Sequence, residues 1–256
     1  MAAGLPLLER ALELATTCDE MAEAAECGSA LAQAYVWSGR FRDAIATSQQ
    51  REQHARRAQQ PYRLHYVYSW LAFLESARGS WEAAEDNLQQ ALASLAGAAS
   101  ALPSAFLHQI RGYLAYQRAE YAHAAQHFRG ALEVFQNKDP FEHQLCFGML
   151  GLTHLAQGNR PMAERSLAEQ EVLLRRLRAG SLPSASAAST LLLLAVGLED
   201  RDRIAALLPG LQACSGQHHW FLVDRILGEG EALLGQWDAA ARHLDTAEAI
   251  ARAEGL

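Results

Sequence analysis

Two histidines stand four residues apart in the stretch 119–132, AEYAHAAQHFRGAL. On a helix this spacing brings His123 and His127 to one face, where two imidazoles could share a metal ion. Glu120 is the one carboxylate near them in the stretch. Because two imidazoles and a single nearby carboxylate do not complete a ligand set, the pattern favours a polar outer face of the helix. We expect no metal and no other cofactor.

A second group with potential chemistry is Cys214 with His218 and His219, in which a thiol could be activated by an imidazole base. No oxyanion motif or third partner accompanies it, and the chain has neither a Gly-rich phosphate loop nor a Gly-x-Ser-x-Gly motif. We expect the sequence His-His-Trp at 218–220 to open a helix and its histidines to be solvated. The protein is therefore predicted not to be an enzyme, and a metal or thiol enzyme is kept as a third alternative.

Composition indicates what kind of elements must carry these groups. The chain has 256 residues, half of them apolar, with abundant alanine and leucine, and this favours an all-helical fold. A net charge of −7 without a basic stripe argues against nucleic-acid binding. Four scattered cysteines suit a reducing cytoplasm. The longest apolar stretch, 188–198, is too short to cross a bilayer and predicts a buried helix. We see no signal peptide and expect a cytoplasmic protein without membrane contact.

One pattern recurs along the chain. The stretches 79–92, 119–132 and 235–248 each start with a small residue and then carry an aromatic at the third place, alanine at the sixth, a large apolar residue at the tenth and alanine at the thirteenth. Looser copies begin at Gly39 and Gly158, and the first of these has Ser48 and Arg51 in the last two places. Internal repeats of this length indicate a stacked array of like units.

Each copy has a small residue seven positions before its first residue. The unit is therefore a helix, a tight turn and a second helix, with a period of about 40 residues. Two antiparallel helices cross closely only where side chains are short. We expect Ala84 and Ala124 to be buried at the crossings, and Leu88 and Phe128 to project into the next unit. The small residues ahead of the turns are Ala32, Ala72, Gly112, Gly151 and Gly228.

This pattern resembles the tetratricopeptide (TPR) repeat, which has the same order of small, aromatic and large apolar places. The resemblance implies an all-α, right-handed superhelical solenoid of about six helix-turn-helix repeats. The period is longer than the usual 34 residues. Such long arrays are similar to the helical sensor region of large ATP-binding LuxR-type bacterial regulators. One unit departs from the pattern, because Asp200 takes the place of the turn glycine and Pro209 interrupts the second helix.

We predict a single helical-repeat domain that covers residues 1–256. Both ends look like parts of a longer array, since a lone half repeat comes first and no polar capping helix comes last. The half repeat is 1–20, and the repeats are approximately 21–60, 61–100, 101–140, 141–180, 183–216 and 217–256.

In the TPR family, ligands lie along the concave face, which is lined by the first helices of the repeats. Carried over to this chain, the resemblance implies a groove in the first three repeats that is rich in aromatic rings and amides. Rings supply contact area and amides fix orientation, so such a groove suits a neutral peptide, a sugar-like effector or a segment of the same protein. The alternative is that the rings pack against each other. The predicted groove residues are Gln33, Trp37, Tyr66, Ser69, Phe73, Phe106, Gln109, Tyr113, Tyr116 and Gln117.

The preferred hypothesis is a non-catalytic module for protein–protein or effector binding, excised from a larger bacterial signalling or transcription regulator. A protein or peptide partner, or a small neutral effector, would occupy the groove. The second hypothesis is a structural spacer or self-association module that forms a homodimer through its uncapped ends or through the apolar inner face of the fourth and fifth units. The residues of that face are Leu152, Leu155, Leu194 and Leu198.

Overall fold

The computed structural model describes residues 4–95, 101–136, 138–178 and 181–256. In these ranges the chain forms thirteen α-helices, and one isolated bridge between His218 and Leu222 is the sole β-type pairing. The predicted all-α class is confirmed. The helices are α1 (Leu5–Thr17), α2 (Met21–Trp37), α3 (Phe41–Arg57), α4 (Pro61–Ala77), α5 (Trp81–Ser94), α6 (Ala101–Gln117), α7 (Tyr121–Phe135), α8 (Pro140–Ala156), α9 (Arg160–Leu174), α10 (Leu182–Gly197), α11 (Arg201–Leu211), α12 (Val223–Leu233) and α13 (Trp237–Glu254).

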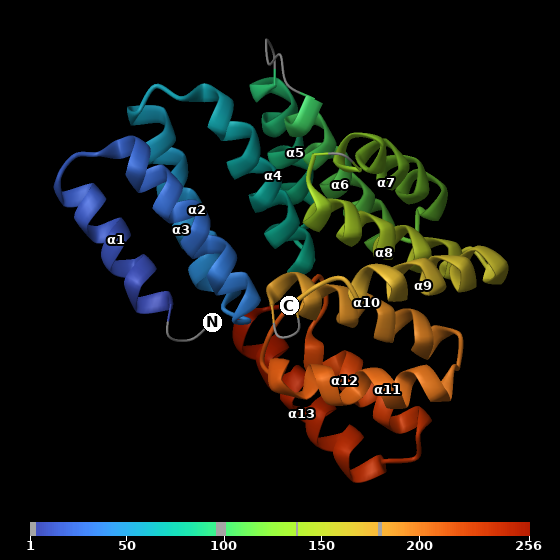
Figure 1. Ribbon diagram of the computed structural model, residues 1–256. Coiled ribbons are helices and arrows are strands. Elements are labelled where there is room, and N and C mark those ends of the chain that lie inside the picture. The colour runs from blue at the N-terminus through green and yellow to red at the C-terminus, as the bar shows by residue number, and fades with distance from the viewer. Residues whose placement is uncertain (1–3, 96–100, 137, 179–180) are drawn as a thin grey trace. The chain divides into compact units, whose positions relative to one another are not determined.

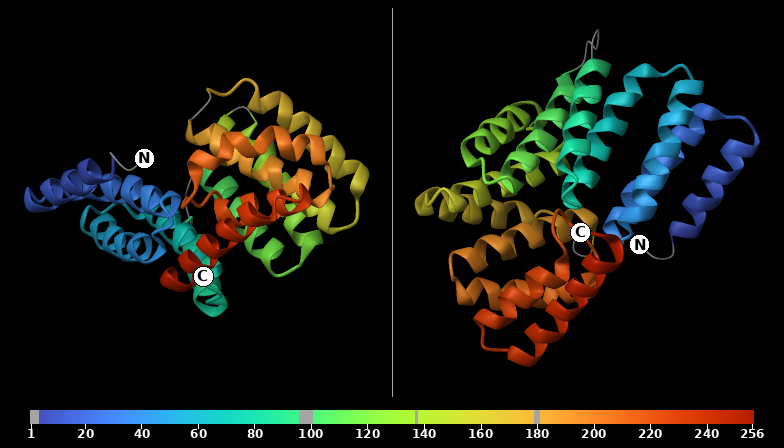
Figure 2. Two further views of the ribbon diagram at one scale, coloured as in Figure 1. Left: turned by 90° about the horizontal axis from the view of Figure 1, so that it is seen from below. Right: turned by 180° about the vertical axis from the view of Figure 1, so that it is seen from behind.

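The helices pack as sequential hairpins of the TPR type (Figure 1). The chain divides into two compact units, one of Met1–Ile110 with Glu254–Leu256 and the other of Arg111–Ala253. In the first unit α1, α2, α3, α4 and α5 lie side by side in chain order, as Figure 2 also shows. In the second unit α7 contacts α8, α8 contacts α9, and α10 contacts α8, α9, α11 and α12. Each hairpin thus buries its apolar side against its neighbours.

The tight turns within the hairpins share one left-handed residue. Gly39, with φ of 72°, is typical, and Ala119 holds the same conformation with φ of 60° although it has a side chain. In the unit of α10 and α11 this residue is Glu199, with φ of 58°, and the prediction of Asp200 was one residue off. Asp200 instead caps α11, because its carboxylate accepts a hydrogen bond from the Arg203 backbone at 3.1 Å. Pro209 lies inside α11, close to its end.

The recurring alanine positions of the repeat lie where the two helices of a hairpin cross, as predicted. Ala84 of α5 and Ala124 of α7 are both fully buried. The large apolar residue of each repeat was predicted to project into the next unit, and for Phe128 the structure shows a close contact within its own hairpin. A methyl group added to Gly112 would lie 2.8 Å from Cε1 of Phe128, so this ring fills the space above the glycine of its own hairpin. The glycine is needed there because the ring leaves no room for a β-carbon.

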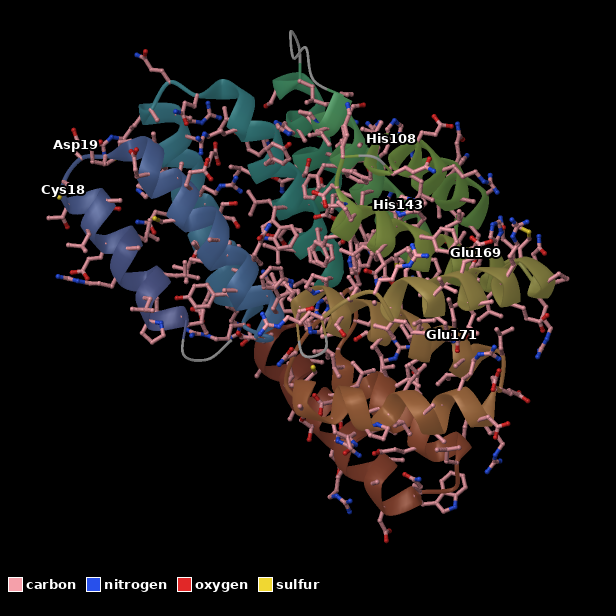
Figure 3. The ribbon with its side chains drawn as sticks, viewed as in Figure 1. Cys18, Asp19, His108, His143, Glu169 and Glu171 are labelled. Carbon is pink, nitrogen blue, oxygen red and sulfur yellow. The ribbon has the colours of Figure 1, made fainter. Side chains whose placement is uncertain are left out.

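The stack of α8 to α11 uses the residues that were predicted to form a dimer face. Leu152, Leu194 and Leu198 are buried, and Leu194 lies against Gly151. Leu155 is half-buried against Gly197. These leucines hold neighbouring helices together, so that they are not an open surface. Across the same stack the guanidinium of Arg203 donates to the Glu171 carboxylate of α9 at 2.9 Å. Figure 3 labels Glu171 among the side chains of this stack.

The apolar stretch 188–198 was predicted to be a buried helix, and it lies in α10 and its C-cap, where most of its side chains are buried. Among the described residues, no helix combines the length and the apolar character that a membrane crossing needs.

Candidate ligand-binding groove

Four of the predicted groove residues in the first unit remain partly accessible. Gln33 and Trp37 lie on α2, Tyr66 on α4 and Phe106 on α6, and each side chain is half-buried. The rings of Tyr66 and Phe106 lie 5.4 Å apart in a tilted arrangement that is typical of favourable aromatic pairs. This pair and Trp37 offer ring surface to a ligand, and Gln33 lies one helical turn before Trp37.

The other three predicted groove residues of this unit lie in the interior. Ser69 and Gln109 are fully buried and Phe73 is nearly so. Phe73 stacks on Trp70 with ring centroids 5.2 Å apart. Trp70, which is half-buried, was missed because counting back from the turn at fixed intervals passes over its position. Burial leaves these three residues available for a ligand only if neighbouring side chains move.

In the second unit, the chain itself covers the predicted residues of α6. Tyr113 is buried with its ring 4.8 Å from that of Trp220, and its hydroxyl donates to the Trp220 carbonyl at 3.2 Å. The Gln117 amide in turn donates to the Tyr113 hydroxyl at 2.7 Å. Tyr116 lies against Phe221 with ring centroids 6.4 Å apart. The alternative of rings that pack against each other is therefore realised around Tyr113.

The loop that carries Trp220 and Phe221 also contains His218 and His219, and the structure corrects the prediction for these two histidines. Helix α12 begins at Val223, so His218 and His219 belong to a loop, and both are buried instead of solvated. Burial lowers the pKa of His218 to about 3 and that of His219 to about 4. His219 shares hydrogen bonds with the Ser186 hydroxyl and the Gln217 amide oxygen, each at 2.9 Å. The spacing of residues in the helical repeats cannot predict which side chains are buried in such a loop.

Two residue groups had potential chemistry, namely Cys214 with its histidines and the pair His123 and His127. The structure arranges neither group as that chemistry would require. Burial raises the pKa of the Cys214 thiol, which disfavours the thiolate that a nucleophile requires. His123 is exposed and lies 3.5 Å from the Glu120 carboxylate, while His127 is half-buried. Throughout the described ranges no three His, Cys, Asp or Glu side chains gather as a metal site would need.

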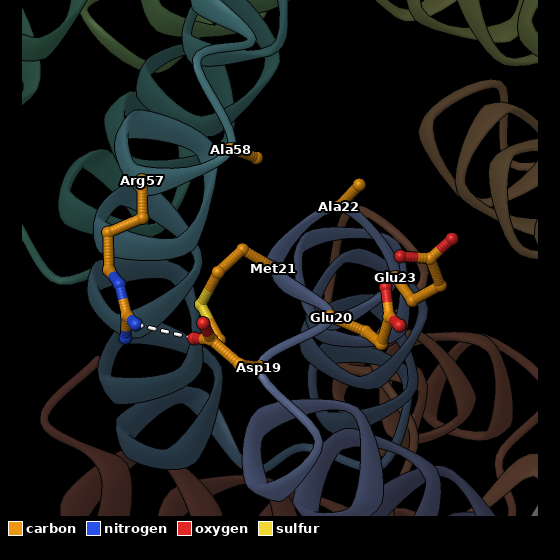
Figure 4. A pocket seen from close by; sticks show the side chains of 7 residues that line it. All are labelled: Asp19, Glu20, Met21, Ala22, Glu23, Arg57 and Ala58. Carbon is orange, nitrogen blue, oxygen red and sulfur yellow. Dashed lines mark hydrogen bonds and ion pairs between the residues drawn. The ribbon is translucent and has the colours of Figure 1, made fainter.

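A separate pocket of about 410 Å³ opens at the turn between α1 and α2 (Figure 4). It is lined by three carboxylates, Asp19, Glu20 and Glu23, and by the end of α3. The Arg57 guanidinium donates to the Asp19 carboxylate at 2.6 Å across its mouth. The pocket lies outside the predicted groove residues, and its charge suits a cationic group more than a neutral one.

Comparisons with known proteins support the fold. No family model matches the sequence, and no curated protein matches it. The structure is similar to the crystal structure of BtubC (BKLC) from P. vanneervenii, with a TM-score of 0.54 and 20% sequence identity. The match covers 82% of this chain and 90% of that one. The chain is thus a TPR-like helical-repeat protein in its fold.

Proposed function

We propose that the protein is a non-catalytic scaffold that binds a partner polypeptide through the half-buried rings of α2, α4 and α6 in its first unit. The observation that carries this proposal is the half-buried set of Trp37, Tyr66 and Phe106, because aromatic rings held on rigid helices are the groups that anchor partners most strongly. The TPR-like fold supports a protein partner in general. The superhelix and its concave side stay predictions, as does the role of Ser69, Phe73, Gln109, Tyr113, Tyr116 and Gln117.

A displayed library of random peptides, selected on the complete chain, tests the proposal. We expect selected peptides to lose at least tenfold in affinity, about 1.4 kcal/mol, to Trp37→Ala and to Tyr66→Ala. Val172→Ala is the control, because the Val172 side chain is 48% exposed on α9 and lies outside the predicted set. Circular dichroism checks that each variant keeps its helices. If every selected peptide binds all three variants equally, this surface is not the binding site.

A second candidate is self-association through α13. On this helix Trp237 is 69% exposed and Leu244 is 41% exposed, and such large apolar side chains favour contact with another apolar surface. Sedimentation at graded concentrations tests it. Wild-type protein should dimerise in the micromolar range and Trp237→Glu should not, and a monomer at all concentrations would contradict the idea.

We also propose that this scaffold serves in a bacterial signalling or transcription regulator. The support is the long, alanine-rich period of about 40 residues, which resembles the sensor regions of such regulators. Sequencing the complete gene tests this origin. A flanking ATPase, cyclase or DNA-binding domain would agree with it, and a gene that encodes an unrelated enzyme domain would not.

A further inference from the structure

The buried side of α3 departs from the repeat pattern at two places. Where other hairpins have a large apolar residue, α3 has Ser48, and where they have Ala91 or Ala131 it has Arg51. Both residues are buried, Arg51 with an exposure of 7%. The opposite helix, α2, has Gly28 at this level, and a methyl group added there would lie 3.4 Å from Cβ of Arg51. The hairpin thus combines small residues with one long cationic side chain.

Arg51 has no partner for its charge among the residues that the structure describes. No hydrogen bond, ion pair or ring contact joins its guanidinium to them, and its Nε is buried without an acceptor. An arginine cannot shed its proton at neutral pH, and a buried charge without a partner is strongly unfavourable. Burial lowers the pKa of Arg51 to about 10, and the nearby Tyr66 hydroxyl acts in the opposite direction.

The α8–α9 hairpin shows how the same position is filled when the donor group of the side chain has acceptors within the chain, although the Gln170 amide oxygen itself has no partner among the described residues. Its residue there is Gln170, which is fully buried opposite Gly148. The Gln170 amide donates to the Gln144 carbonyl at 3.3 Å and is 3.4 Å from the Thr190 hydroxyl. The neutral side chain has acceptors from neighbouring helices. The cationic one on α3 has none among the described residues, so the buried Nε of Arg51 is open to an acceptor from solvent or from a bound group.

A second buried polar group lies on the helix that packs beside α3. Ser69 of α4 is fully buried, and its hydroxyl has no hydrogen-bond partner. It follows Tyr66 by one helical turn, so both lie on the same side of α4, and Tyr66 is the residue whose hydroxyl acts on Arg51. A guanidinium and a hydroxyl, both with unused donors, are what an oxyanion needs.

We propose that Arg51 anchors a binding site for one carboxylate group, between α3 and α4 of the first unit. A carboxylate carries a single negative charge and offers two oxygens to the guanidinium fork. It therefore neutralises one buried arginine, whereas a phosphate dianion would leave a surplus negative charge buried in a chain whose net charge is already −7. Because Arg51 is only slightly exposed, a small group such as one carboxylate can reach it but a bulky ligand cannot. The site lies beside Tyr66 of the partner surface proposed above, but acetate binding at Arg51 is measured separately from peptide binding, so either proposal can fail alone.

The test uses the complete wild-type protein labelled with ¹⁵N and acetate as the probe. The Nε–H signal of Arg51, identified by its loss in Arg51→Ala, is followed while sodium acetate replaces sodium chloride at constant ionic strength. We expect a saturating shift with acetate only. The signal of Arg42, an exposed arginine of the same helix, is the control and should not saturate. Equal responses of Arg51 to acetate and to chloride would overturn the proposal. The Arg51→Ala variant serves only to assign the signal, and the titration itself is made on the wild-type protein.

Further probes distinguish the sources of the carboxylate. N-acetylglutamate amide imitates an acidic side chain, N-acetylglycine imitates a chain terminus, and acetate stands for a small free acid. The probe that saturates at the lowest concentration identifies the source, and saturation by any of them supports the site. Inorganic phosphate that saturates at a lower concentration than all three would overturn the assignment to a carboxylate. As a second readout, acetate should raise the thermal midpoint of the wild type and of Arg42→Ala, and leave that of Arg51→Ala unchanged.

Discussion

The hairpins α2–α3 and α6–α7 share the left-handed turn residue, but the seams, meaning the buried lines of contact between their two helices, are of opposite kinds. In α7 the buried side is Ala124, Phe128 and Ala131, and the Phe128 ring sits on Gly112. In α3 it includes Ser48, Arg51 and His54, and Gly28 lies opposite. The glycines thus have different neighbours, because Gly112 makes room for an apolar ring and Gly28 faces the stem of a charged side chain. One backbone plan can hold either a tight apolar contact or a polar one.

The largest expected effect comes from the apolar seam. Phe128→Ala should lower the free energy of unfolding by about 3–5 kcal/mol, since it leaves a ring-sized hole against Gly112. Urea unfolding followed by circular dichroism measures it. Trp237→Ala is the control, because a ring that is 69% exposed should change stability by only about 0.5 kcal/mol. Equal losses in the two variants would mean that the seam is not what holds α6 and α7 together.

The crossing itself is tested by Ala124→Leu. Three added carbons have no space at a fully buried position, so we expect a loss of about 1–3 kcal/mol in the same urea experiment. Ala122→Leu, on the exposed side of α7, is the matched control and should be close to neutral. A neutral Ala124→Leu would show that the helices do not meet at this residue.

The two glycines give the sharpest contrast. Gly112→Ala should destabilise the protein by about 1–3 kcal/mol, because the new methyl group would lie 2.8 Å from the Phe128 ring. Gly28→Ala should instead stabilise it by about 0.5–1 kcal/mol, since alanine is the better helix former and its methyl group would have ordinary contact at 3.4 Å. Thermal unfolding of both variants checks the opposite signs. The same sign in both would remove the difference between the seams.

The smallest effect is a dependence on pH that only the polar seam has. Burial, and next the charge of Arg57, lower the pKa of His54 below its ordinary value of about 6.5. Above that value His54 is neutral in both the folded and the unfolded chain and does not affect the pH dependence. As the pH falls below it, the unfolded chain binds a proton first and stability decreases.

Urea midpoints measured between neutral and mildly acidic pH test this effect. His54→Gln should flatten the fall in stability relative to the wild type. The buried His218 and His219 titrate in both proteins, so the difference between the two curves isolates His54. Parallel curves would contradict the role of His54.

Much of the fold could be predicted because the repeat spacing reports contacts directly. Ala84 and Ala124 recur at a fixed place since the crossing recurs, and both are buried. The turn at Glu199 was placed one residue late because it has no glycine to mark it.

The candidate site was harder to predict because a position on a helix does not reveal what lies opposite. The acceptors around Gln170, and the absence of any for Arg51 within the described ranges, depend on groups from neighbouring helices. Likewise, the cover over Tyr113 comes from Trp220 in an aperiodic loop, 107 residues away. The residue spacing within one repeat predicts neither which acceptors lie near Gln170 or Arg51 nor the cover over Tyr113. Contacts between repeats and loops decide which predicted rings stay accessible.

Several turns of the array hold non-glycine residues in the left-handed conformation, and the packing of the helices has to outweigh the free-energy cost of that conformation. Ala119 and Glu199 hold a conformation that disfavours a β-carbon by roughly 1–2 kcal/mol, and Asp19 and Gln59 hold it in the turns before α2 and α4. Glycine would relieve this strain in the folded state, although part of the gain would be offset by its greater freedom in the unfolded chain. The packing on either side of these turns is therefore strong enough to impose an unfavourable backbone on ordinary residues, and the protein tolerates that strain at several turns at once.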